Sequence, residues 1–142
     1  MSLYILDTDI LSSIQNDNRV VVDRAEKAIA DRHSVGLSIV SVEEQFYGWQ
    51  KELNAARSVT EFAKASRSLT RAVRLWANFP IYPETESSRT TLQQLVRLKL
   101  NVGKNDLRIA SVVFDLGAIL VTHNHVDFRR IPGLRFEDWA TP

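Results

Sequence analysis

The sequence predicts an α/β fold, in which helices pack against a parallel sheet. Three short apolar runs, at residues 3–6, 35–40 and 119–122, carry this prediction. Each run is rich in Leu or β-branched residues and does not alternate with polar residues, as expected for strands that are covered on both faces. Helical patterns separate the runs, and this order indicates βαβ units and an α/β sandwich.

The helices are predicted from apolar spacing and from capping signals. The clearest covers residues 58–79, where apolar residues at helical spacing oppose a basic face, and Pro80 ends it. Ser41 and Glu44 have the spacing of a capping box for a helix at 43–53. Asn105 is expected to cap the helix that begins at Asp106. Further helices are expected at 20–30 and 86–100, and a short strand at 81–82.

Composition limits the functions that the chain can have. Its 142 residues are 44% hydrophobic and 25% charged, which suits one domain spanning residues 1–142. The absence of Cys excludes disulfides, thiolate zinc sites and a Cys nucleophile. A net charge of +1 excludes attraction of the whole surface to nucleic acid or membrane, but not a local patch. No apolar run suggests a membrane span or signal peptide, so we expect a cytoplasmic protein.

Four acidic residues stand at related places in the predicted fold. Asp7 directly follows the first strand, Glu44 lies one turn into the helix after the second, and Asp127 follows the third by five residues. Asp106 opens a helix. Ligands of open α/β sheets bind at the carboxyl ends of the strands. Carboxylates gathered there repel one another unless a cation lies between them, and oxygen ligands select Mg²⁺ or Mn²⁺. The pattern therefore predicts a metal-dependent enzyme that acts on phosphate esters.

Four segments that contain these acids also carry a resemblance to a known family. They are similar, in the same order, to the four motifs of PIN-domain ribonucleases of the VapC toxin type. The resemblance implies a three-layer α/β/α sandwich with a central, mostly parallel sheet. The segments are residues 4–11 (Tyr-Ile-Leu-Asp-Thr-Asp-Ile-Leu), residues 38–48, residues 103–110 (Gly-Lys-Asn-Asp-Leu-Arg-Ile-Ala), and residues 120–128 followed by Ile-Pro-Gly-Leu at 131–134.

The resemblance also implies an activity and partners. Members of the family are expected to be endoribonucleases that depend on Mg²⁺, which Mn²⁺ can replace. Their cleavage of RNA leaves a 5′-phosphate and a 3′-hydroxyl. They are toxins of type II toxin–antitoxin pairs, often homodimers held by a cognate antitoxin. In the first motif Asp9 replaces the usual Asn, which adds a negative charge near the metal.

The resemblance assigns the catalytic roles to the same four acids. Asp7 and Asp106 are expected to be the main metal ligands, and Glu44 to bind the metal through water or to orient the nucleophile. Asp127 or Asn124 completes the cluster. The residues expected to support these ligands are Thr8, Asp9, Asn105 and Thr122, and those expected to contact RNA are Lys104 and Arg108.

Other interpretations of these residues remain open. Asp7 could cap the next helix, and Asp106 could be favoured by its helix dipole without any catalytic role. Asp7 and Asp9 after a buried strand also suit a phosphotransferase of the haloacid-dehalogenase type. The chain could alternatively bind RNA or a partner without cutting. His123 and His125 could bind a metal, but no third soft ligand is near them, which favours surface or packing roles.

Overall fold

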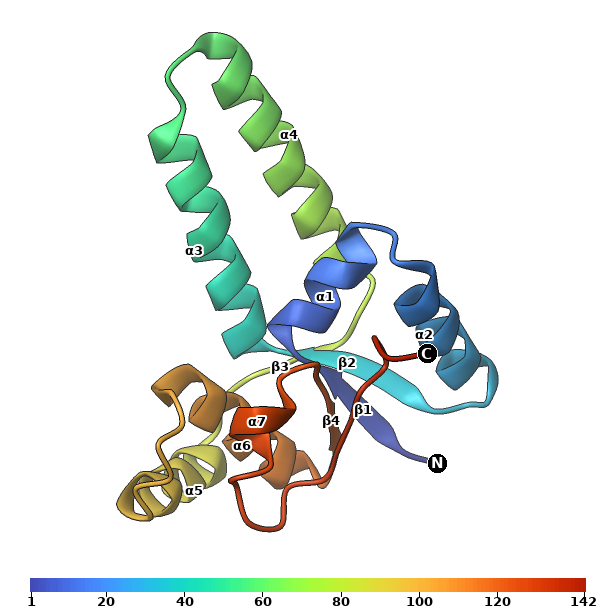
Figure 1. Cartoon of the computed structure of the whole chain (residues 1–142), viewed down its shortest axis with the longest axis vertical. Helices are drawn as coiled ribbons and strands as arrows, with labels where there is room; N and C mark the ends of the chain where they lie inside the picture. The colour runs from blue at the N-terminus through green and yellow to red at the C-terminus, as the bar shows by residue number, and fades with distance from the viewer.

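The computed structural model describes residues 1–142 and contains a wholly parallel, five-stranded sheet with the order β3-β2-β1-β4-β5 (Figure 1). The chain adds β2 and β3 on one side of β1, and then places β4 and β5 on the other side. The order therefore reverses between β1 and β4, where open α/β sheets bind their ligands. The strands are β1 (Leu3–Leu6), β2 (Ser34–Ser38), β3 (Ile81–Tyr82), β4 (Ile119–Val121) and β5 (Phe136–Glu137).

Helices cover both faces of this sheet, which confirms the predicted α/β/α sandwich. Consecutive strand residues point to opposite faces, so Ile5 packs into one core and Leu6 into the other. Helices α5, α6 and α7 cover the Ile5 face, whereas α1, α2 and the end of α4 cover the Leu6 face. The helices are α1 (Thr8–Gln15), α2 (Arg19–Ala30), α3 (Ile39–Ala55), α4 (Val59–Trp76), α5 (Glu86–Arg97), α6 (Lys104–Leu116) and α7 (His125–Phe128).

Helices α3 and α4 form an antiparallel pair, here called the arm, which extends away from the sheet (Figure 1). Its base is tied to α1, because buried Gln45 accepts the indole N–H of Trp76 at 2.7 Å and donates to the hydroxyl of Ser12 at 3.1 Å. Further out, Phe62 and Val73 are exposed, so only part of the apolar stripe predicted on α4 is buried.

Several element boundaries differ from the prediction. Strand β2 ends at Ser38, and α3 begins at Ile39 rather than at residue 43, because the Ser38 hydroxyl accepts the N–H of Val40. The predicted capping box of Ser41 and Glu44 is therefore wrong, and Ser41 is buried inside the helix. Helix α6 begins at Lys104, so Asn105 is not its cap, and α5 ends at Arg97.

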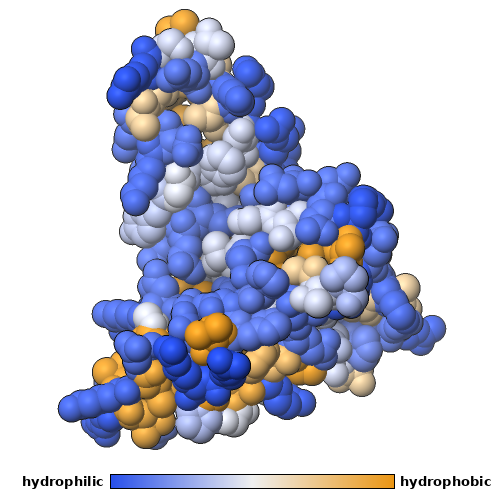
Figure 2. All heavy atoms as spheres, in the orientation of Figure 1, coloured by the Kyte–Doolittle hydropathy of each residue, from blue (hydrophilic) through white to orange (hydrophobic).

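The surface differs between the arm and the opposite end of the molecule. Figure 2 shows a mostly hydrophilic arm, whereas apolar surface gathers at the lower left, over the end of α5. Val96 and Leu98 are exposed in this part of the chain. None of the helices combines the length and the apolar character that crossing a membrane requires.

Candidate functional site

Asp7 lies at the carboxyl end of β1, where the strand order reverses. Its backbone N–H donates to the carbonyl of Val121 at 2.8 Å, which holds it beside the end of β4. Its carboxylate accepts the hydroxyl of Thr122 at 2.8 Å and the N–H of Thr8 at 2.8 Å. Asp7 also caps α1, so its capping role and a role as a ligand are compatible. Only 5% of the residue is exposed, which makes its carboxylate expensive to ionise without a counter-charge.

Glu44 reaches the same edge from the first part of α3. The helix starts directly after β2, the neighbour of β1, so its early turns stand above the carboxyl ends of the strands. The hydroxyl of Thr8 donates to the Glu44 carboxylate at 2.8 Å. Thr8 and Thr122 thus hold two of the predicted acids in fixed positions, as hydrogen bonds to metal-binding carboxylates commonly do.

Asp106 joins this group from the first turn of α6. Burial, together with the charges of Glu44, Asp127 and Asp9, raises the pKa of Asp106 to about 6. Burial, the charge of Asp9 and the charge of Asp106 likewise raise the pKa of Asp7 to about 7, against the lowering by its two hydrogen bonds. The five carboxylates therefore act on one another. We call Asp7, Asp9, Glu44, Asp106 and Asp127 the acidic centre.

The acidic centre has the donor chemistry of a site for a hard divalent cation. Its donors are all carboxylate oxygens, which suit Mg²⁺ or Mn²⁺ and not a soft metal. One acid of the centre, Asp127, has an arginine nearby, because Arg130 lies 3.4 Å from it, whereas Arg108 binds Glu43 and Glu84 outside the centre. Asp7, Glu44 and Asp106 form no ion pair with Lys or Arg, and burial together with repulsion from neighbouring carboxylates raises the pKa of both aspartates. The residues present thus fit a divalent cation.

The fourth segment supplies both candidates for the last ligand, Asn124 and Asp127. The side-chain amide of Asn124 donates to Asp127 Oδ2 at 3.0 Å, while Arg130 approaches Oδ1. Asp127 acts electrostatically on Asp106. This arrangement favours Asp127 as the acid of the centre and gives Asn124 the task of orienting it.

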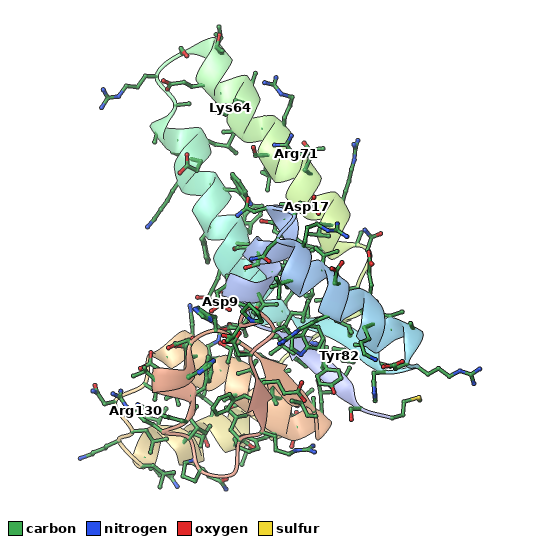
Figure 3. All side chains as sticks on the ribbon, turned by 45° about the vertical axis from the view of Figure 1, so that its right-hand side comes forward. Asp9, Asp17, Lys64, Arg71, Tyr82 and Arg130 are labelled. Carbon is green, nitrogen blue, oxygen red and sulfur yellow. The ribbon has the colours of Figure 1, made fainter.

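Asp9 stands at the border of the acidic centre, between the arm and the lower part of the molecule (Figure 3). Its carboxylate accepts the backbone N–H of His123 at 3.2 Å. Partial desolvation raises the pKa of Asp9 although the residue reaches solvent, and this hydrogen bond lowers it. Its charge also raises the pKa of Asp7, so the replacement of the usual Asn makes the centre more negative.

Asn105 and Arg108 make their side-chain hydrogen bonds outside the acidic centre. Asn105 accepts a hydrogen bond from Arg108 at 3.1 Å and supports none of the acids, so its expected supporting role is not favoured. The guanidinium of Arg108 is held by Glu84 at 2.7 Å and by Glu43 at 3.1 Å, and its side chain is only 14% exposed. An arginine neutralised in this way is not available to RNA. Lys104 is exposed and makes no ion pair, so RNA contact remains a prediction for it.

Sequence reasoning noted His123 and His125 but missed Asp138, which completes a polar cluster with them. Asp138 lies between His123 and His125, with N···O distances of 3.0 Å and 2.9 Å. Only a predicted pairing of β5 with β4 could have indicated this cluster, because the pairing brings the residues after both strands to the same edge of the sheet. Strand β5 was not predicted, because two residues are too short to show a pattern.

Comparisons with known proteins agree with this geometry. The family model described as the PIN domain matches residues 4–134, which include all four motif segments. Ribonuclease VapC1 of Haemophilus influenzae (strain R2866) is 30% identical over 140 residues, covering 97% of this chain and 98% of that protein. Ribonuclease VapC2 of Rickettsia felis is 28% identical over 137 residues, covering 96% of this chain and 98% of that protein.

A solved structure shows the same fold over nearly the full length. A chain of the crystal structure of VapBC2 from Rickettsia felis, bound to a DNA fragment from its promoter, superimposes on this chain with a TM-score of 0.80 at 25% identity. The match covers 96% of this chain and 98% of that chain. Together these relatives favour the nuclease interpretation over the phosphotransferase of the haloacid-dehalogenase type.

Proposed function

Because the chain belongs to the PIN-domain family and is similar over nearly its whole length to VapC-type ribonucleases, we propose that it is a Mg²⁺-dependent endoribonuclease. The observation that carries the proposal is the acidic centre. Its carboxylates act on one another near the place where β1 and β4 part, and four of them, all but Asp127, form no ion pair with Lys or Arg. A phosphodiester is an anion, so such a site can attract it only if a cation neutralises the carboxylates first.

Asp7, held beside the end of β4, and Asp106, in the first turn of α6, would be the main ligands of that cation. Burial and neighbouring carboxylates raise their pKa values to about 7 and about 6, which is consistent with this role. Mn²⁺ can replace Mg²⁺, since both prefer carboxylate oxygens. When bound, the ion supplies positive charge to the phosphate oxygens and lowers the pKa of an attacking water. Asp127, oriented by Asn124, completes the ligand set.

Glu44 positions the attacking water. The hydroxyl of Thr8 donates to one of its oxygens, which leaves the other oxygen to accept a hydrogen bond from the water. The water oxygen forms a bond to phosphorus while the bond to the 3′-oxygen breaks, and a proton ends on the 3′-oxygen. The products are a 5′-phosphate and a 3′-hydroxyl. Thr122 keeps Asp7 in place during this reaction.

Metal removal tests the activity directly. Purified chain incubated with RNA and excess EDTA should lose cleavage, and Mg²⁺ or Mn²⁺ added beyond the chelator should restore it. The products should carry 5′-phosphates, which a 5′-phosphate-dependent exonuclease detects. Turnover that continues at full rate in EDTA contradicts the proposed mechanism.

The family resemblance further supports a toxin that pairs with a cognate antitoxin, and a homodimer as its working form. Expression of the chain without a partner should slow bacterial growth, and Asp7→Asn should relieve the arrest. The alternative, a module that binds RNA without cutting it, predicts the opposite result. In that case the variant retains binding and the arrest persists.

A further inference from the structure

Two histidines and one aspartate meet beside the acidic centre, on two segments that leave neighbouring strands. His123 follows β4, His125 begins α7, and Asp138 follows β5. Strands β4 and β5 pair in parallel, with Val121 opposite Glu137, so both segments leave the sheet at the same edge. One ligand atom from each of the three residues lies within 4.8 Å of the other two.

The distances within this cluster suit a shared metal ion. His123 Nδ1 lies 3.0 Å from Asp138 Oδ2, and His125 Nε2 lies 2.9 Å from the same oxygen. Ligand atoms about 2.1 Å from a Zn²⁺-type ion, at tetrahedral or octahedral angles, are roughly 3.0–3.4 Å apart. Small movements of the two exposed imidazoles are therefore enough to accommodate an ion between the three atoms.

Asp138 is already held in place for such a role. Its Oδ1 accepts the N–H of Ala140 at 2.8 Å, and the hydroxyl of Thr141 donates to Oδ2. The Asp138 side chain is only 8% exposed, whereas those of His123 and His125 are 63% and 46% exposed. A fixed carboxylate under two accessible imidazoles leaves an open side, on which water can fill the remaining coordination positions.

We propose that His123 Nδ1, His125 Nε2 and Asp138 Oδ2 bind a divalent first-row transition-metal ion, of which Zn²⁺ is representative. Imidazole ligands favour Zn²⁺, Co²⁺ or Ni²⁺ over Mg²⁺, so this site and the acidic centre select different ions. Asp9, which accepts the N–H of His123, lies between the two sites. The ion joins the turn after β4 to the segment after β5, and thereby fixes one border of the acidic centre.

The test is metal binding by the full chain, stripped of metal with a chelator and then placed in excess Mg²⁺ to fill the acidic centre. Titration with Zn²⁺ by calorimetry, and with Co²⁺ by visible absorption, should show one equivalent bound. His123→Gln and His125→Gln should each weaken Zn²⁺ binding by at least ~10-fold, since loss of even an outer-shell partner commonly has that effect. Both side chains are exposed, so these variants should fold.

The third histidine supplies a matched control. His33 accepts the N–H of Ser2 and belongs to no such cluster, so His33→Gln should bind Zn²⁺ like the original chain. Zn²⁺ should raise the unfolding temperature of the original chain and of His33→Gln, but not that of His125→Gln, because an ion stabilises only the folded state that binds it.

Three results would overturn the proposal. One is the absence of stoichiometric Zn²⁺ or Co²⁺ binding in Mg²⁺, which leaves the cluster as two imidazoles hydrogen-bonded to one carboxylate. Another is binding that neither histidine variant weakens. The last is binding that disappears when both Asp7 and Asp106 are changed to Asn, which places the ion in the acidic centre. None of these measurements depends on RNA cleavage, so they are independent of the proposed function.

Discussion

Glu43 and Glu44 are neighbours in α3 but belong to two different clusters of carboxylates. The two clusters differ in whether a cationic side chain lies between the carboxylates. Glu43 lies with Glu84 around the guanidinium of Arg108, at 3.1 Å and 2.7 Å. Glu44 turns toward Thr8 and the acidic centre, where Asp106 stands two positions before the same arginine. The first group has a cation of the chain between its carboxylates, whereas in the acidic centre only Asp127 has one nearby, Arg130 at 3.4 Å.

This difference indicates which charges serve the fold and which are left for a ligand. In the Arg108 group two carboxylates share one guanidinium, and their hydrogen bonds raise the pKa of the guanidinium above its usual value. In the acidic centre, burial and repulsion instead raise the pKa values of Asp7 and Asp106. Removing a carboxylate should therefore have different consequences in the two groups.

The largest effect is expected from Asp106→Asn. This change removes a proposed main ligand but keeps the shape of the side chain, so RNA cleavage should fall by more than ~100-fold while the fold is retained. Gel-based cleavage of labelled RNA in Mg²⁺ measures the rate, and circular dichroism monitors folding. Glu84→Gln, on the other side of Arg108, is the control and should cleave RNA at close to the normal rate. Comparable activity in both variants contradicts the assignment of Asp106.

The next largest effect is expected from the adjacent pair. Glu44→Gln should slow cleavage by ~10–100-fold, because the amide cannot accept from water as a carboxylate does while Thr8 can still hold it. Glu43→Gln should change the rate by less than about threefold, since the residue contacts only Arg108. Initial rates at saturating Mg²⁺ compare the two. If Glu43→Gln slows cleavage more than Glu44→Gln does, the roles assigned to Glu43 and Glu44 are the wrong way round.

Much of the fold could be predicted from the sequence, because the strands buried on both faces leave continuous apolar runs. The run at 35–40 was extended too far, since Ile39 and Val40 are apolar residues that begin α3 rather than end β2. Strand β5 has only two residues and was not predicted. Local pattern thus located the long elements and failed where an element is short or where two elements share an apolar stretch.

The candidate site was predictable where position along a strand determines it. Asp7 follows β1, and the early turns of α3 follow β2, so chain order alone placed Asp7 and Glu44 at one edge. Contacts between segments far apart in the sequence could not be predicted in this way. Arg108 meets Glu84 and Glu43 across 24 and 65 residues of sequence, and neither pairing leaves a local signal.

A smaller effect is expected on stability as the pH changes. The pKa of Asp7 in the folded chain is about 7, above the value of 3.8 for an unperturbed Asp. The folded state therefore holds more protons than the unfolded state between these values, and the free energy of unfolding should fall as pH rises through this range. Without metal, the loss between about pH 5 and pH 7.5 should be on the order of 2 kcal/mol.

Urea unfolding in EDTA at several pH values measures this slope. Mg²⁺ should reverse the loss near neutral pH, because it binds the ionised carboxylates of the folded state. Asp7→Asn should flatten the slope, since its amide does not titrate. A metal-free chain whose stability rises steadily up to neutral pH contradicts an uncompensated Asp7.

The smallest expected effect distinguishes the two carboxylate groups most clearly. Substitutions in the two groups should change the free energy of unfolding in opposite directions. In the metal-free chain Glu84→Gln should lower the free energy of unfolding by about 1 kcal/mol, because it leaves Arg108 with one carboxylate instead of two. Asp106→Asn should raise it, since it removes repulsion from Glu44, Asp127 and Asp9. Urea unfolding at neutral pH in EDTA compares the two variants.

Mg²⁺ should not change the loss of unfolding free energy caused by Glu84→Gln. It should cancel the gain of unfolding free energy caused by Asp106→Asn. Destabilisation of the metal-free chain by both changes would mean that the acidic centre is satisfied within the fold and needs no cation.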